Sequence, residues 1–304
     1  MPKTYIVEKD YQNSRFDRWF KAKIINLPQS LIEKIIRLNK IKINRKRAKS
    51  SYRVQCGDII EVYDISKFKV SDKIRISKYK PSRKEVNIYD DYIIENNENF
   101  VVINKPAGIA VQSGTKSLRN IIDILRKTKE FEDSSPYTVH RIDKETTGIL
   151  IVAKNRKYAQ LFTSLFRIRK IHKTYLGIVV GKLNESKGSF IDYLFYNEGA
   201  KKIKVKAITN FQVVDSNNNY SLLRLDPVTG RKHQLRKQLL IHGYPILGDF
   251  KYNFLNTKNN KKNSLMLHAY KINFSINGIK HKYTAELPEN FKNFLSEKYL
   301  KNYF

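Results

Sequence analysis

A carboxylate surrounded by cations is the sharpest chemical feature of this sequence. Asp143 lies in the motif HRIDKETTG at residues 140–148, on a polar turn between two apolar stretches that we expect to be strands. His140, Arg141 and Lys144 place positive charge beside it, which favours the ionised form of a carboxyl group. An ionised carboxylate presented on a rigid turn suits a nucleophile or a general base. The motif alone fits equally well an acidic turn residue that pairs with a neighbouring arginine.

A second chemical feature is the run DPVTGRKHQLRKQLLIHG at residues 226–243. Gly230 ends a predicted strand and Arg231 begins a predicted helix, which gathers Arg231, His233 and Arg236 at the helix N-terminus. The unpaired amide N–H groups of such a terminus favour anions. The cluster could therefore hold a phosphate and supply a charge partner for a catalytic carboxylate. The alternative is the solvated basic face of an amphipathic helix, although cations at this end oppose the helix dipole.

Both motifs resemble signatures of the RluA/RluC/RluD family of ribosomal-RNA pseudouridine synthases. The aspartate motif departs from the family pattern at Ile142, where leucine is usual, and residues 229–236 are similar to the family's TGRxHQ[IL]R block. Further similar blocks follow in the family's order, namely NKPAG at 104–108, KTY at 173–175, GYPILGD at 243–249 and LHA at 267–269. Residues 1–64 resemble the αL RNA-binding motif that many members carry at the N-terminus. The resemblance covers nearly the whole chain.

The resemblance implies a role for each matching residue. Asp143 would be the catalytic aspartate and would act on the ribose of the target uridine, either by attack at the anomeric carbon or by removal of the neighbouring sugar proton. Tyr175 would lie against the base and take part in the final proton removal. Arg231 would pair with Asp143, and Arg141 would fill the stack that the flipped uridine leaves. Uracil detaches, turns and rejoins through carbon, so the resemblance implies no cofactor and no metal.

Eight basic residues are predicted to contact RNA. They are Lys105, His140, Arg141, His233 and Arg236 in the catalytic region, and Arg45, Arg47 and Arg53 near the N-terminus. The last three could instead form a solvated face, but their density on a small module favours phosphate contacts.

The residues after Gly108 are similar to the RluC branch of the family, which implies uridines of large-subunit (23S) ribosomal RNA as the substrate. Other members modify tRNA, which stays open as an alternative substrate. A hypothesis of a different class is a non-catalytic RNA-binding protein that assists ribosome assembly. The presence of Asp143, Tyr175 and Arg231 together favours the enzyme, because a protein that has lost catalysis usually loses one of its catalytic residues.

The elements expected around these motifs predict an α+β fold. Strands are predicted near 100–104, 109–111, 137–142, 149–153, 173–180, 205–214 and 220–226, with helices near 117–127 and 156–170. Because strands outnumber helices and do not alternate with them, we expect a pseudouridine synthase catalytic domain on a mostly antiparallel mixed sheet. Asn277-Gly278 predicts a tight hairpin near the C-terminus. This domain should span 92–304, after a charged linker at 65–91.

The region before the linker should be a small basic αL RNA-binding domain at residues 1–64. A first helix is predicted from Ser14 as N-cap, with Phe16, Trp19 and Phe20 on its apolar side. A second helix is predicted from Ser30, which forms a capping box with Glu33. Residues 1–84 contain 23 Lys and Arg against 8 Asp and Glu, about half of the net charge of +31 in the 304-residue chain.

The composition bounds the class of protein. A net charge of +31 suits a polyanionic partner such as RNA. Cys56 is the single cysteine, so no internal disulfide can form, and no apolar stretch is long enough for a signal peptide or a membrane span. The six histidines show no metal-ligand spacing. We therefore expect a cytoplasmic monomer that binds no membrane.

Overall fold

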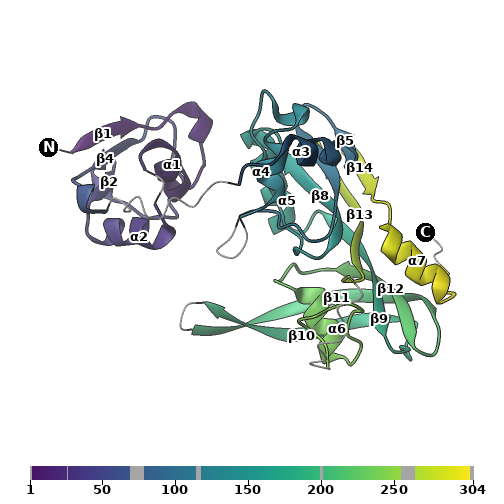
Figure 1. The fold of residues 1–304 in the computed structure, drawn as a ribbon. Coiled ribbons are helices and arrows are strands. Elements are labelled where there is room, and N and C mark those ends of the chain that lie inside the picture. The colour runs from purple at the N-terminus through teal and green to yellow at the C-terminus, as the bar shows by residue number, and fades with distance from the viewer. Residues whose placement is uncertain are drawn as a thin grey trace. The chain divides into compact units, whose positions relative to one another are not determined.

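The computed structural model describes residues 2–25, 27–68, 79–113, 118–198, 201–254 and 264–301. The chain divides into two compact units, Met1–Ser77 and Lys78–Phe304 (Figure 1). Among the helices of the described ranges, none combines the length and the apolar character needed to cross a bilayer.

The first unit is a small four-stranded sheet with two helices. Its sheet has the order β1-β4-β2-β3 and every pairing within it is antiparallel. The elements are β1 (Lys3–Ile6), α1 (Phe16–Lys23), α2 (Gln29–Arg37), β2 (Ile41–Ile43), β3 (Lys46–Arg47) and β4 (Ile59–Val62). Phe16, Trp19 and Phe20 on α1 are fully buried in one apolar cluster with residues of α2 and the strands, as the helical spacing predicted.

Both predicted helix caps in this unit are wrong. The Ser14 carbonyl accepts a hydrogen bond from the Val54 backbone N–H, so the chain is still paired at Ser14 and α1 begins at Phe16. In α2 the N-cap position belongs to Pro28, and no side chain caps the helix. Ser30 lies inside the first turn, two residues past the N-cap position, so it does not form the predicted capping box with Glu33.

The second unit is built on a ten-stranded mixed sheet, and the predicted α+β architecture is confirmed. The main path has the order β10-β11-β12-β9-β13-β8-β6-β5, with β14 on β13 and β7 on β8. Among the described strands of this sheet, only β8 and β13 pair in parallel. The strands are β5 (Ile93–Asn96), β6 (Phe100–Lys105), β7 (Tyr137–Thr138), β8 (Thr147–Ala153), β9 (His172–Val180), β10 (Lys187–Glu198), β11 (Lys201–Ser216), β12 (Tyr220–Pro227), β13 (Leu267–Ile276) and β14 (Ile279–Thr284).

Helices cover the sheet on two sides. They are α3 (Arg83–Asp90), α4 (Ile121–Leu125), α5 (Arg156–Arg167), α6 (Gln234–Ile241) and α7 (Glu289–Glu297). All seven residues of β8 are buried, because alternate side chains enter different apolar clusters. Leu150 and Val152 pack in a cluster that includes residues of α3 and α4, whereas Ile149 and Ile151 pack with residues of α5. β8 therefore forms a rigid base for the turn that precedes it.

Several predicted boundaries differ from the structure. Residues 83–90, expected to be linker, form α3, whose Tyr89 is buried in the core of the second unit. The strand expected at 109–111 is reduced to a single bridge, between Ala110 and Asn120. Of the helix expected at 117–127, residue 117 lies outside the described residues and α4 covers 121–125. The Asn277-Gly278 hairpin is confirmed, with both residues at positive φ.

The parallel contact between β8 and β13 depends on a glycine. Gly148 has φ +103° and pairs with Ala269, and a Cβ at this position would lie 2.3 Å from the Ala269 carbonyl oxygen. Two constraints therefore act here, a left-handed backbone and the absence of space for any side chain.

We predict that Gly148→Ala destabilises the second unit more than Gly243→Ala does. Both residues have positive φ, which costs alanine about 1–2 kcal/mol, but Gly243 has open space where Gly148 meets backbone. Overpacking should add about 1–3 kcal/mol at Gly148 alone. Urea unfolding followed by far-ultraviolet circular dichroism measures both losses. Equal losses of unfolding free energy in the two variants would show that β13 can move away from the new side chain at position 148 without cost.

Candidate active site

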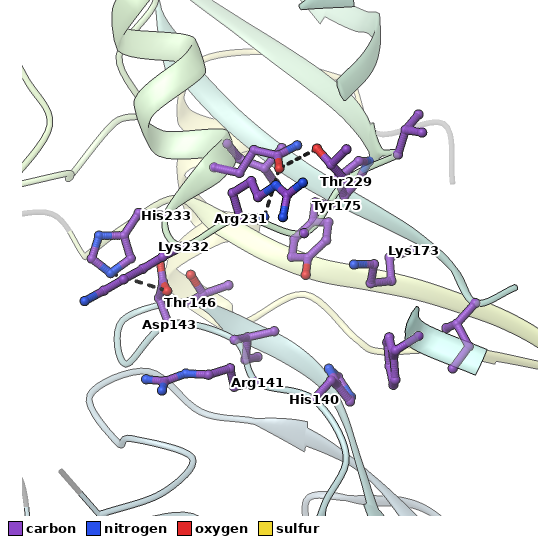
Figure 2. A pocket seen from close by; sticks show the side chains of 18 of the residues that line it. His140, Arg141, Asp143, Thr146, Lys173, Tyr175, Thr229, Arg231, Lys232 and His233 are labelled. Carbon is purple, nitrogen blue, oxygen red and sulfur yellow. Dashed lines mark hydrogen bonds and ion pairs between the residues drawn. The ribbon is translucent and has the colours of Figure 1, made fainter. Parts of the chain in front are cut away.

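A cavity of about 630 Å³ in the second unit contains the predicted catalytic aspartate (Figure 2). Its walls come from the loop before β8, the end of α5, strand β9, and the loop that joins β12 to α6. Seven of the predicted residues line this one cavity, namely Asp143, Tyr175, Arg231, His140, Arg141, His233 and Arg236. Sequence segments that are almost a hundred residues apart therefore meet at one site.

Asp143 faces a guanidinium and an imidazole on the α6 side of the cavity. Arg236 Nη1 lies 3.3 Å from Asp143 Oδ2, and His233 Nε2 lies 3.6 Å from Oδ1. Ile142, the residue before Asp143, is buried in the core. The side chain of Asp143 is 24% exposed and remains open to the cavity. The carboxylate is thus oriented and still accessible.

Arg236 is shared between two carboxylates. Its Nε and Nη2 lie 2.6 and 2.7 Å from the two oxygens of Asp249, whose side chain is fully buried. Burial alone would lower the pKa of Arg236, but the hydrogen bonds from Asp249 and the charges of Asp249 and Asp143 raise it above its ordinary value. The guanidinium therefore stays charged, and its bidentate pair with Asp249 fixes the remaining nitrogen toward Asp143.

The predicted pairing of Arg231 with Asp143 is wrong in this structure. Arg231 lines the cavity, but its Nε donates to the Lys206 carbonyl oxygen at 3.2 Å. The reason is the position of the helix start. Arg231 was expected to begin the helix, whereas α6 begins at Gln234. Arg231 therefore lies in the loop beside β11, and Arg236, in the first turn of α6, is the arginine that reaches Asp143.

His233 is positioned by an unusual backbone conformation. It has φ +52° and precedes α6 as its N-cap residue, a conformation that costs a non-glycine residue free energy. Its Nδ1 lies 2.8 Å from the Tyr252 hydroxyl, and its Nε2 faces Asp143, as Figure 2 shows. Burial lowers the pKa of His233, while the charge of Asp143 acts in the opposite direction. Both ring nitrogens are therefore engaged by the site.

Gln234 fixes the loop before α6. Its Oε1 accepts from the Thr229 hydroxyl at 2.7 Å and from the Arg231 backbone N–H at 3.0 Å. Its Nε2 donates to the Ile208 carbonyl on β11 at 3.0 Å. These bonds satisfy buried polar groups of an irregular loop and hold it against the sheet. Gln234 and Asp249 lie in motifs that were recognised in the sequence, but neither was predicted to have a role in the site.

Tyr175 and Lys173 lie on β9 at the other side of the cavity. Burial raises the pKa of Tyr175, and the nearby charge of Asp143 raises it further, so the phenol stays protonated at neutral pH. Burial lowers the pKa of Lys173, whose ammonium lies 5.9 Å from the centre of the Phe166 ring. Figure 2 shows the Lys173 side chain directed toward Tyr175. Within the described ranges, Lys173 has no carboxylate or carbonyl partner.

His140 supports the backbone instead of offering a charge to RNA. Its Nε2 accepts the Ile151 backbone N–H at 2.8 Å, just beyond the point where β7 stops pairing with β8. Its ring packs on Phe166 with 4.6 Å between ring centres. Burial lowers the pKa of His140 to about 3, and Lys173 lowers it too, so the ring is neutral at pH 7. The prediction that His140 binds RNA as a cation is therefore not supported.

Lys105 cannot contact RNA, contrary to the prediction. The residue is fully buried, and its Nζ donates to the carbonyl oxygens of Pro106, Ile109 and Lys144 at 2.7, 3.1 and 3.0 Å. Burial lowers the pKa of Lys105 to about 7, opposed by the charges of Glu145 and Asp143. All three N–H directions of the ammonium are occupied. Lys105 therefore ties the loop after β6 to the loop that carries Asp143.

The other predicted RNA contacts remain open to a ligand. Arg141 is exposed at the cavity and makes no ion pair within the described part of the chain. In the first unit, Arg45, Arg47 and Arg53 are all exposed. Arg47 and Arg53 each donate to a backbone carbonyl, which leaves the rest of each guanidinium to solvent. No group of three His, Cys, Asp or Glu residues in the described ranges is arranged to hold a metal ion.

Comparison with known proteins agrees with this geometry. Residues 99–240 match the family model for RNA pseudouridylate synthase. A protein of Buchnera aphidicola subsp. Acyrthosiphon pisum named ribosomal large subunit pseudouridine synthase C is 33% identical over 95% of both chains. The chain belongs to the RNA pseudouridylate synthase family. It is thus an enzyme, and the expectation from the motifs is confirmed.

Two further matches extend this relationship. A protein of Rickettsia conorii, also named ribosomal large subunit pseudouridine synthase C, is 34% identical over 92% of this chain and 95% of its own length. Among solved structures, human RNA pseudouridylate synthase domain containing 4 is 27% identical, with a TM-score of 0.61. The structural match covers 69% of this chain and 94% of the human chain. The fold of the catalytic region is therefore shared across distant members.

His268 anchors the strand that follows the catalytic loop. It is fully buried, its Nε2 lies 3.2 Å from the Ala285 carbonyl, and its Nδ1 lies 2.8 Å from the Thr147 hydroxyl. Because a carbonyl can only accept, Nε2 must carry the proton and Nδ1 must accept from Thr147. Burial lowers the pKa of His268 from 6.5 to about 4, opposed by the bond to Ala285.

We predict that His268 makes the fold sensitive to acid. The folded pKa lies below the unfolded value, so the unfolded chain binds the proton more readily, and stability is lost as pH falls from about 6.5 to about 4. The loss should approach about 3 kcal/mol. His268→Gln keeps a donor and an acceptor but does not titrate. The free energy of unfolding of this variant, relative to that of wild type, should therefore rise as pH falls from about 6.5 to about 4. Urea unfolding at several pH values measures the difference, and parallel curves would contradict the assignment.

We also predict that Arg236→Met destabilises the second unit by about 3–5 kcal/mol, because it leaves Asp249 buried without a partner. Arg236→Met/Asp249→Leu should recover most of this loss while remaining inactive, because Asp143 still lacks its guanidinium. Arg231→Met, which removes one bond to a carbonyl, should unfold close to wild type. Urea unfolding and pseudouridine formation are measured side by side. An active double variant would show that the Arg236–Asp143 contact is dispensable.

Proposed function

We propose that this enzyme isomerises specific uridines to pseudouridine in large-subunit ribosomal RNA, with Asp143 as the catalytic aspartate. The observation that carries the proposal is the arrangement of one accessible carboxylate, oriented by Arg236 and His233, opposite a partly buried tyrosine in a single cavity. The names of the relatives support the choice of large-subunit ribosomal RNA over tRNA.

The reaction breaks the bond from the ribose anomeric carbon to N1 of uracil and forms a bond from the same carbon to C5. N1 gains a proton and C5 loses one, so the reaction is balanced without a redox cofactor. Asp143 either attacks the anomeric carbon or removes the neighbouring sugar proton, and its open position suits both routes. Oriented hydrogen-bond donors keep a carboxylate in the reactive geometry without rearrangement during the reaction.

Tyr175 and Lys173 form the wall on which the detached base would turn. The raised pKa of Tyr175 keeps it a neutral phenol, which suits packing on uracil and donating a hydrogen bond to it, and makes Tyr175 a poor base for removal of the C5 proton. Uracil that leaves with the bonding electrons is anionic, and a buried cation stabilises such a charge more strongly than an exposed one. The ammonium of Lys173 lies on the cavity wall without a competing carboxylate within the described ranges. We assign it this stabilising role.

The target uridine must leave its stack before it can enter the cavity, which costs a few kcal/mol. Exposed Arg141 is placed to occupy the vacated stack, as the family resemblance implies. In the first unit, Arg45, Arg47 and Arg53 supply cations for phosphate contacts, so we propose that this unit is the αL RNA-binding domain. The enzyme is proposed to act as a monomer, in the cytoplasm where ribosomes are made.

The alternative of a non-catalytic assembly factor is less well supported. An Asp143 that served only to cap a turn would not require a fully buried Asp249 to aim a guanidinium at it.

Asp143→Asn should abolish pseudouridine formation in unmodified large-subunit ribosomal RNA, with a loss of about four orders of magnitude or more. The amide has the same shape but cannot act as nucleophile or base. Glu145→Gln is the matched control, because Glu145 is an exposed carboxylate on the same loop and should keep near wild-type activity. Pseudouridine is mapped by chemical derivatisation and primer extension, with tRNA tested in parallel. If wild type modifies neither RNA, the proposed function fails.

A further inference from the structure

Strands β10 and β11 form a long two-stranded ribbon that extends beyond the rest of the second unit (Figure 1). Their register places Tyr193 opposite Lys206 and Phe195 opposite Lys204. Side chains that are opposite each other in an antiparallel pair lie on the same side, and alternate residues along a strand share a side. We call this side the outer face. It carries Ile191, Tyr193, Phe195, Lys202, Lys204 and Lys206.

The other side of the ribbon is covered by the enzyme itself. Phe190 and Leu194 are buried, and Gln238 of α6 donates to the Phe190 carbonyl at 3.1 Å. On the outer face, by contrast, Ile191, Tyr193 and Phe195 are 57%, 54% and 50% exposed. A contiguous row of large apolar side chains left in solvent marks an interaction surface.

The lysines of the outer face lie over its aromatic rings. Lys204 Nζ is 4.5 Å from the centre of the Tyr193 ring, and Lys202 Nζ is 4.8 Å from that of Phe195. The face carries no carboxylate at positions 191, 193, 195, 202, 204 or 206. Aromatic rings for stacking beside cations for phosphates are the combination that binds single-stranded nucleic acid. A second copy of this chain would instead bring lysines against lysines.

The ribbon is attached directly to the wall of the cavity. Arg231 Nε donates to the Lys206 carbonyl at 3.2 Å, and the Tyr196 hydroxyl donates to the Lys232 carbonyl at 2.8 Å. Arg231 and Lys232 both line the cavity that contains Asp143. The ribbon therefore adjoins the cavity that would receive the target nucleotide.

We propose that the outer face is a docking site for unpaired RNA nucleotides that flank the target uridine, with bases on Tyr193 and Phe195 and phosphates at Lys202, Lys204 and Lys206. Side chains two residues apart on a strand are about 6.7 Å apart. This is about twice the 3.4 Å spacing of stacked bases. The two rings therefore suit nucleotides already drawn out of a helix. The proposal rests on the proposed function only in taking RNA as the substrate.

The first test measures RNA binding by full-length protein in the Asp143→Asn background, so that no turnover occurs. The probes are a short single-stranded oligouridylate and a fully paired RNA of the same length. Tyr193→Ala/Phe195→Ala should weaken binding of the single strand at least tenfold, the loss expected when one stacked base is released. Binding of the paired RNA should change much less. Tyr193→Phe/Phe195→Tyr keeps both rings and should restore affinity.

Salt dependence separates the lysines from the rings. Lys202→Gln/Lys204→Gln should reduce the slope of log affinity against log salt by about one for each lysine, while the aromatic variant leaves the slope unchanged. The matched control is Ile279→Ala/Lys280→Gln, which removes an exposed apolar residue and a lysine from the β13–β14 hairpin and should bind like wild type. Circular dichroism verifies that each variant is folded.

Three results would overturn the proposal: unchanged affinity of the aromatic variant, an equal loss for paired RNA, or an equal loss in the control. The first would leave a protein partner as the occupant of this face. With the catalytic aspartate restored, the aromatic variant should raise KM and leave kcat unchanged at saturating RNA. If wild type binds RNA through this face but forms no pseudouridine, the proposed function fails and the docking site stands. If wild type forms pseudouridine but the aromatic variant binds RNA as wild type does, the proposed function stands and the docking site fails.

Discussion

The charge balance around Arg236 is the constraint on which the rest of the site depends. One guanidinium meets two carboxylates, the fully buried Asp249 and the accessible Asp143. A buried carboxylate without a partner is expensive, so Asp249 requires the arginine whether or not a substrate is present. Because the fork of the guanidinium is planar and rigid, satisfying Asp249 also determines where the remaining nitrogen points. Asp143 is therefore oriented by a guanidinium that a buried ion pair already holds in place.

Backbone carbonyls and amides around the site are satisfied by long polar side chains. Lys105 joins three carbonyls of two loops, and Gln234 joins the loop before α6 to the neighbouring strand. Irregular segments cannot satisfy their own backbone groups, so they need such partners when they are buried. The backbone requires a hydrogen-bond donor at Lys105 and an amide at Gln234. This requirement explains why both residues occur within motifs although neither is assigned a role in the reaction.

The sequence predicted which residues gather in the cavity better than it predicted their side-chain contacts. Asp143 and Tyr175 share one cavity, and the α+β sheet is present, because a reactive residue type and strand periodicity are local signals. The predicted partner of Asp143 was wrong because α6 begins three residues later than expected. This shift places Arg236 beside Asp143 in the position expected for Arg231. Lys105 was predicted to contact RNA because it is a lysine in a family motif. Its burial depends on a carbonyl acceptor that is distant in the sequence, at Lys144, and no local pattern reveals such an acceptor.

Strand β10 was not predicted for a related reason. Its residues 190–196 are apolar or aromatic at nearly every position, with side chains on both faces of the ribbon, so the alternation that identifies a half-buried strand is missing. The absence of alternation is itself informative here, because one of the two faces is exposed. A strand without a polar side in a region that is not buried on both sides indicates a surface meant for a partner.

The first unit contains the single tryptophan of the chain, Trp19, in its core, with the indole N–H donating to Glu8 at 3.3 Å. The cavity and the ribbon lie entirely in the other unit. Indole emission is thus an optical signal that originates in the N-terminal unit alone. A titration with RNA can therefore be followed in two channels, one that tests the proposed binding of RNA to the N-terminal unit and one that measures formation of product. If both units bind RNA, as proposed, the order in which they do so becomes a kinetic observable without any label.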